Sequence, residues 1–188
     1  MSFIYHVKPD RMFGNILYPL NALKEIDNET YDFHASKYKG RESLMEHKIP
    51  ILDCLWNDVL HCSSIDLRII YNALIKNGHK VRNMEFFKIP VGMLKDIKFV
   101  KYKFEKEAFD RDKKQYRVLT SEDIEPLTID THQETSDLPD KTIEWYRWCA
   151  EHNKGPRLLF RYIPHIFVKG SINTKELEVI DWSQKLDG

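Results

Sequence analysis

The sequence has few of the residues that mark specialised classes of protein. Its three cysteines, Cys54, Cys62 and Cys149, are an odd number without CxxC spacing, which argues against a disulfide framework and a structural zinc site. No apolar run approaches the roughly 20 residues that cross a bilayer, and the first residues lack the apolar core of a signal peptide. We therefore expect a cytoplasmic protein with free thiols, no metal and no membrane partner.

An excess of charge of either sign is also absent. Lys and Arg number 29 and Asp and Glu number 29, so the formal net charge is zero. No global field then attracts the chain to nucleic acid, and this class of partner has no support from the charge. The sequence also contains no phosphate loop and no complete catalytic triad motif, so no motif by itself names an activity.

Material for a hydrophobic core is abundant. Hydrophobic residues make up 42% of the 188 residues and aromatic residues 12%, which suits a single globular domain over residues 1–188. Helical and strand patterns are interspersed, so we predict an α+β fold with a mixed or split antiparallel sheet and flanking helices. The clearest helix is opened by Asp66 and stopped by Gly78, and a second helix begins at Pro139.

Apolar and aromatic runs bounded by turn residues predict the strands. These cover residues 3–7, 85–91, 97–104, 115–119, 158–168 and 178–182, with a further helix over residues 19–26. Residues 120–137 are acidic, Thr-rich and poor in large apolar side chains, which is typical of a long flexible loop. The pattern of residues 49–64 is ambiguous between helix and strand.

The densest polar group in an apolar setting lies between Asp53 and Ser63. A carboxylate and an imidazole held against apolar walls acquire shifted pKa values, which general acid or base catalysis requires. Asp58 and His61 are therefore candidates for the catalytic pair of a hydrolase. The alternative is that these side chains cap turns and hold loop backbone, a common role for their residue types.

Two further histidines, His6 and His165, lie in predicted strands. Each could contact a ligand from a rigid strand, or be satisfied by a backbone carbonyl inside the protein. Arg41, within KYKGRE, could bind a phosphate group, or lie in a solvated turn.

Three stretches, IYHVKPD, KIPILDCLWNDVLHCSS and HIFVKGSINTKELEVIDW, resemble in their layout the DarT-type branch of the ADP-ribosyltransferases. The resemblance spreads over most of the chain. It implies transfer of ADP-ribose from NAD to a nucleic-acid base or a protein side chain, on a split α+β sheet. His6 would match the first-strand histidine that contacts NAD, and Glu178 is the nearest match to the catalytic glutamate. That family usually places its glutamate just before the strand that is HIFVKG here, where this chain has Tyr162 and Ile163.

The resemblance predicts one cleft in which His6, Arg41 and Trp56 bind NAD as cofactor. The candidate catalytic residues are His6, Asp58, His61 and Glu178, with Glu178 stabilising the positive charge that develops on the ribose.

A competing hypothesis is a non-catalytic interaction domain. In it, exposed aromatic side chains such as Tyr146, Trp148 and Phe109 would form a surface for a partner protein or for a homo-oligomer.

Overall fold

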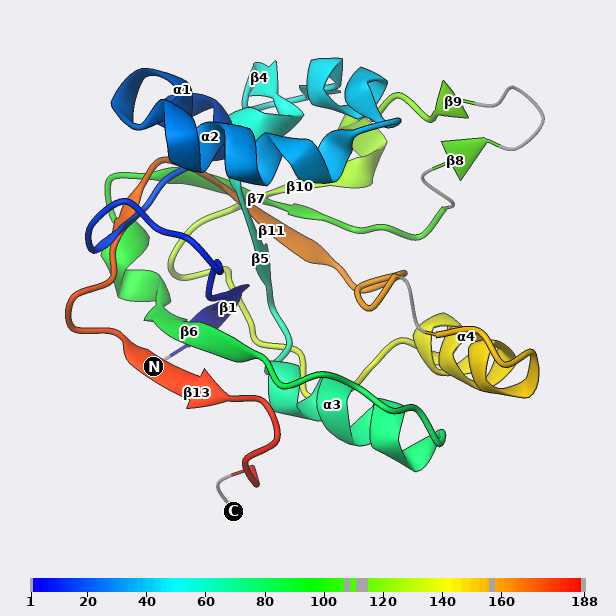
Figure 1. The fold of residues 1–188 in the computed structure, drawn as a ribbon. Helices are drawn as coiled ribbons and strands as arrows, with labels where there is room; N and C mark the ends of the chain where they lie inside the picture. The colour runs from blue at the N-terminus through cyan, green and yellow to red at the C-terminus, as the bar shows by residue number, and fades with distance from the viewer. Residues whose placement is uncertain (1, 107–108, 111–114, 156–157, 187–188) are drawn as a thin grey trace.

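The computed structural model describes residues 2–106, 109–110, 115–155 and 158–186, and a large antiparallel sheet runs through it (Figure 1). The seven strands of this sheet lie in the order β10-β7-β11-β5-β1-β6-β13. Their bounds are β1 Phe3–Val7, β5 Leu60–Ser63, β6 Glu85–Pro90, β7 Lys98–Tyr102, β10 Ile124–Leu127, β11 His165–Lys169 and β13 Glu178–Asp181. Every recorded pairing in the sheet is antiparallel, and the predicted α+β class is confirmed.

Apolar side chains cover both faces of the sheet. In β6, Phe86 and Phe87 are both buried although neighbouring side chains point to opposite faces, so this strand is covered on both sides. Phe87 packs in a cluster with Ile4 and Ile166, whereas Phe86 packs with Tyr5 against the helices of the other face.

In the described part of the chain, four α-helices flank the sheet, α1 Leu20–Ile26, α2 Asn28–Ala35, α3 Leu67–Lys76 and α4 Asp140–Glu151. Figure 1 shows α1 and α2 together at one side of the molecule and α3 and α4 at the other. The predicted caps of α3 are confirmed, because the Asp66 carboxylate accepts from the Arg68 amide at 2.9 Å and Gly78 has a φ of 80°.

The remaining short elements lie in the connections between the strands of the sheet and between strands and helices. They are the paired strands β2 Ile16–Leu17 with β12 Ile172–Asn173, β3 Lys48–Ile49 with β4 Cys54–Leu55, and β8 Phe109–Asp110 with β9 Gln115–Tyr116, and the 3-10 helices η1 Ser36–Tyr38, η2 Glu42–Glu46, η3 Trp56–Asp58, η4 Val91–Leu94 and η5 Ser121–Asp123. The ambiguous residues 49–64 thus contain the end of β3 and then β4, η3 and β5.

The sheet splits beside β1. On one side β1 pairs with β6 along its whole length, over five residue pairs. On the other side β1 meets β5 at one pair, Tyr5 with Ser63. A continued antiparallel register would bring His6 opposite Cys62 and then Val7 opposite His61. Within one continuous sheet, β1 and β5 therefore separate between the end of β1 and the start of β5.

The prediction of one long loop over residues 120–137 is wrong. This segment contains η5 and then β10, which pairs with β7 at the sheet edge. Ile124 is buried and Leu127 packs against the core, so two apolar residues suffice for a strand that covers one face. Pro126 is compatible with this position because an edge strand can lack a backbone donor.

One other prediction needs correction, and one helix was not predicted. The strand expected over residues 158–168 is confined to β11, because the chain turns before it and Tyr162 has a positive φ of 63°. Helix α2 lies in a stretch that shows no apolar stripe, and Thr30 is its one buried residue. Among the described ranges, none of the helices has the length and apolar character that crossing a membrane needs.

Candidate functional site

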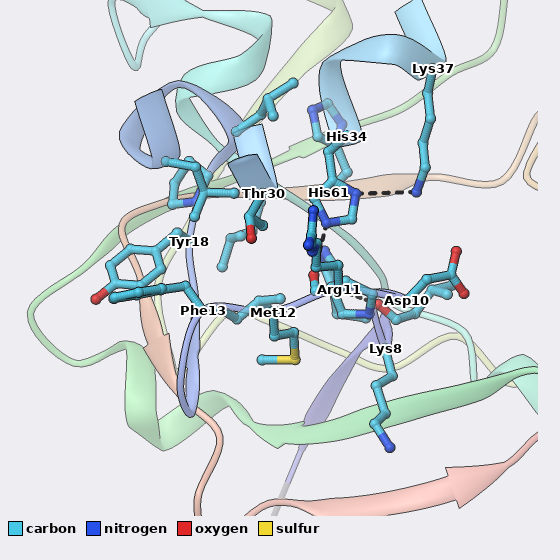
Figure 2. A pocket seen from close by; sticks show the side chains of 18 of the residues that line it. Lys8, Asp10, Arg11, Met12, Phe13, Tyr18, Thr30, His34, Lys37 and His61 are labelled. Carbon is cyan, nitrogen blue, oxygen red and sulfur yellow. Dashed lines mark hydrogen bonds between the residues drawn. The ribbon is translucent and has the colours of Figure 1, made fainter. Parts of the chain in front are cut away.

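A cavity of about 670 Å³ opens where β1 and β5 separate (Figure 2). Its wall comes from the end of β1, the chain leading into α1, helix α2, the start of β5 and the chain before β6. The wall residues are His6–Phe13, Ile16–Leu20, Leu23, Thr30, His34, Lys37, Tyr38, Asn57, Val59–His61 and Arg82–Glu85. Strands β1 and β5, which separate here, thus supply two of the walls.

The end of β1 leads directly into this wall. The Lys8 amide donates to the Glu85 carbonyl at 2.9 Å, which is the last bond of β1 toward β6. Pro9 follows and fixes its own φ, so the chain leaves the ladder and turns along the cavity. Every residue from His6 to Phe13 therefore lines the cavity.

A rigid 3-10 turn, η3, forms the opposite wall. The Asp58 carboxylate accepts from the Leu55 amide at 2.7 Å and from the Asn21 side chain at 2.7 Å, tying η3 to α1. Asn57 projects from the same turn, and its side chain is 1% exposed. The local bonds of Asp58 hold this turn, and with it Asn57, in place against the cavity.

Three imidazoles lie along neighbouring strands at the split. His6 Nδ1 contacts the Val7 carbonyl at 2.6 Å, His61 Nε2 the Trp56 carbonyl at 2.9 Å, and His165 Nδ1 the Ile163 carbonyl at 2.7 Å. A carbonyl only accepts, so each of these nitrogens carries the proton when the ring is neutral. The second nitrogen of each ring is then an acceptor, and it has no recorded hydrogen-bond partner within the described part of the chain.

These three rings are also electrostatically linked. Burial lowers the pKa of His6 to about 4 and that of His165 to about 4. Burial, and then the neighbouring His165, lowers the pKa of His61 to about 3. A second cavity of about 160 Å³ is lined by all three rings and shares His6 and His61 with the larger one. At neutral pH all three rings are therefore uncharged.

The charge of the wall is mainly positive. Its side chains include four cations, Lys8, Arg11, Lys37 and Arg82, against two carboxylates, Asp10 and Glu85. Lys8 and Glu85 pair at 2.7 Å. Arg11 lies 3.5 Å from Glu29, a long contact for an ion pair. Although the whole chain is neutral, the cavity suits an anionic ligand.

Apolar and charged side chains are separated within the cavity. Figure 2 shows Met12, Phe13 and Tyr18 at one side of the view and Lys37, Asp10 and Lys8 at the other. Phe13 is 47% exposed, so its ring is available for contact. A ligand with a planar ring and an anionic group fits this division.

The structure brings together some of the predicted site residues. His6 and His61 both line the cavity. Trp56 lies behind His61, with 4.6 Å between the ring centroids. Trp56 therefore supports the wall from behind.

Two predicted residues have structural roles. Asp58 uses both carboxylate oxygens within the turn, on Leu55 and Asn21, and this geometry bears out the capping alternative over a catalytic Asp58–His61 pair. Arg41 is exposed, donates to the Lys37 carbonyl and lies over the Tyr38 ring at 5.8 Å. Arg41 therefore contacts the wall residues Lys37 and Tyr38 but does not line the cavity itself.

Glu178 lies apart from these residues, and the prediction that it shares a cleft with His6 is wrong. In the sheet, His6 aligns with Phe87 and Val179, whereas Glu178 aligns with Lys88 and Tyr5. Aligned residues of antiparallel strands point to the same face, so Glu178 points away from His6 and is two strands, about 10 Å, distant. Its carboxylate is exposed and lies 3.6 Å from the Lys88 ammonium.

The aromatic side chains that the interaction hypothesis expected on the surface pack mainly against other residues of the protein. Tyr146 is fully buried, and its hydroxyl donates to the Leu159 carbonyl. Trp148 is 38% exposed and stacks with Trp145 and His152. The side chain of Phe109 lies outside the described residues.

Sequence reasoning missed the cationic wall residues Lys8, Arg11 and Lys37. The signal was the run KPDR directly after the first strand, where a proline-induced turn carries charged residues across the strand end. Within the described part of the chain, no group of three or more His, Cys, Asp or Glu side chains is placed to hold a metal ion. Comparison with protein-family models, with curated proteins and with solved structures gave no match.

Proposed function

We propose that the cavity between β1 and β5 binds an NAD-type dinucleotide and that the protein transfers ADP-ribose from it. The observation that carries the proposal is the split of the sheet beyond the Tyr5–Ser63 pair, which opens a cavity with His6 and His61 in its wall. The volume of about 670 Å³ lies within the range of small-molecule and cofactor sites.

The wall chemistry matches the parts of a dinucleotide. Lys8, Arg11 and Lys37 provide donors for a diphosphate. Phe13 and Tyr18 provide faces for a planar ring. The neutral rings of His6 and His61 offer acceptor nitrogens that suit ribose hydroxyl groups.

The proposed reaction is a substitution at the ribose carbon that carries nicotinamide. The bond from that carbon to the nicotinamide nitrogen breaks, and its electron pair leaves with nicotinamide. A nucleophilic atom of the acceptor forms the new bond, and its proton is released to solvent water, because the imidazoles of the site stay uncharged. Asp10 and Glu85 are the carboxylates of the wall, so these two, and not Glu178, are the candidates to stabilise positive charge on the ribose.

The test is calorimetric titration of NAD into the protein at pH 7.5, followed by incubation with NAD labelled in the adenylate portion. We expect saturable binding, with Kd raised at least tenfold in Arg11→Glu and in Lys37→Glu. Glu178→Gln is the control and should bind as the wild type does, because Glu178 lies outside the cavity. Absence of a binding heat at millimolar NAD would overturn the proposal.

A further inference from the structure

Helix α2 and the 3-10 turn η1 that continues it present a polar stripe to the cavity. Thr30, His34 and Lys37 are four and three residues apart, a spacing that places side chains on one face of a helix, and all three line the cavity. A helix face that packs against a core is apolar. The polar stripe of α2 therefore indicates that this face serves the cavity.

His34 joins the two cationic segments of the wall. Its Nε2 lies 2.8 Å from the Arg11 carbonyl and its Nδ1 lies 3.3 Å from the Lys37 ammonium, and Figure 2 shows both bonds as dashed lines. A carbonyl only accepts and an ammonium only donates, so Nε2 donates while Nδ1 accepts. One tautomer of this imidazole thus holds the backbone of Arg11 and the side chain of Lys37 together.

The ring of Phe33 brings the same two cations near one another. The Arg11 guanidinium carbon lies 5.8 Å from the centroid of this ring, and the Lys37 ammonium lies 5.7 Å from it. The two positive charges repel each other. Glu29 compensates for them weakly, because its carboxylate is exposed and lies 3.5 Å from Arg11. Two like charges held in this way favour an anion between them.

We infer that Arg11 and Lys37 form a diphosphate subsite of the cavity and that His34 is its positioning residue. This inference rests on the proposed dinucleotide site, and it assigns the diphosphate to the α2 wall. Lys37 has two N–H groups left after its bond to His34, and Arg11 makes only long contacts with Glu29, so both cations have donors for phosphate oxygens. The imidazole fixes their spacing before the ligand binds, which lowers the entropy lost on binding.

The test measures the Kd of NAD by calorimetry at pH 7.5, and the Kd of inorganic pyrophosphate by its competition with NAD. The proteins are the wild type, His34→Leu and His34→Gln. His152→Leu is the matched control, because His152 is an exposed histidine at the end of α4 that also bonds a backbone carbonyl but lies outside the cavity. An unfolding curve checks that each variant is folded.

We expect His34→Leu to raise the Kd of NAD and of pyrophosphate about tenfold, because both cations lose their common anchor. His34→Gln should return both values to within about threefold of the wild type, since its amide supplies one donor and one acceptor at a similar separation. A His34 that only held α2 to the neighbouring chain would leave pyrophosphate binding unchanged.

Three results would overturn the inference while leaving the dinucleotide site intact. They are NAD binding that His34→Leu leaves unchanged, pyrophosphate that fails to compete at millimolar concentration, and affinities that His34→Gln does not restore. Absence of NAD binding by the wild type would instead overturn the proposed function itself.

Discussion

The two edges of β1 differ in a way that separates structure from function. Toward β6, five residue pairs form a continuous ladder, and the side chains beside it fill the core. Toward β5, one pair forms, and the strand end beyond it lines a cavity. A ladder satisfies backbone groups within the sheet, whereas a split leaves polar and charged side chains free to contact a ligand.

Two aligned residues of the neighbouring strands β1 and β6 show the same contrast between core and cavity. His6 and Phe87 are aligned neighbours, yet the ring of Phe87 is buried in the core and the imidazole of His6 opens to the cavity. The environment of each position thus depends on how far the next strand extends. The following predictions test this difference, beginning with the largest expected effect.

Removal of a core ring on the paired side should have the largest effect on stability. Phe86 is fully buried in β6, so Phe86→Ala should lower the free energy of unfolding by about 3–5 kcal/mol. Urea unfolding measures the loss. Phe33→Ala is the matched control, because Phe33 is 41% exposed and the same truncation there should cost less than about 1 kcal/mol. Equal losses in the two variants would contradict the assignment of Phe86 to the core.

His61, which lies where β1 and β5 separate, should make the free energy of unfolding depend on pH. In the folded protein His61 stays uncharged down to a pKa of about 3, whereas in the unfolded chain it takes up a proton below about 6.5. Its folded pKa is lowered, so its contribution is complete above pH 6.5 and is lost as the pH falls from 6.5 toward 3.

Between pH 7 and pH 5 this histidine should account for about 1–2 kcal/mol of lost stability, and His61→Gln should reduce the pH dependence by that amount. Urea unfolding at the two pH values checks it. Val118→Ala, at a 69% exposed residue that does not titrate, should leave the pH dependence unchanged. An identical pH dependence in His61→Gln would show that its ring is not held uncharged.

The anchor of η3 should have a smaller effect on stability than on binding. Asp58→Ala removes the acceptor for the Leu55 amide and the Asn21 side chain, which should cost about 1 kcal/mol. Because η3 carries Asn57, we also expect the Kd for NAD to rise about tenfold. Asp130→Ala, at an exposed aspartate, should change neither quantity. Loss of stability with unchanged affinity would separate η3 from the binding site.

The smallest effect is expected at the far edge of the sheet. Glu178 is exposed and makes one long ion pair with Lys88, so Glu178→Gln should change stability by less than about 0.5 kcal/mol. Binding of NAD should also stay within twofold of the wild type. A large loss of binding or of transfer would return Glu178 to the catalytic role that the resemblance implied.

Local patterns predicted local structure well. The cap at Asp66 and the glycine at Gly78 were sufficient to place α3, because both signals act within a few residues of the helix. The strand that carries His6 was equally clear. By contrast, α2 could not be recognised, since it shows no apolar stripe and Thr30 is its one buried residue.

The site depends on strand order, which no local pattern contains. Whether His6 lies near His61 or near Glu178 is decided by the neighbours of β1, which are β5 and β6, while β13 joins beyond β6. The stretch from Asp53 to Ser63 was correctly singled out. Within this stretch, Asp58 anchors the turn, and Asn57, which the sequence did not single out, is a wall residue of the cavity.

Hydrogen–deuterium exchange with and without saturating NAD tests most directly whether the split of the sheet is the binding site. The account predicts slower exchange of the amides in residues 6–12 and 57–61, on the two walls of the cavity, with little change in β13. Unchanged exchange on both walls, or protection confined to β13, would contradict it.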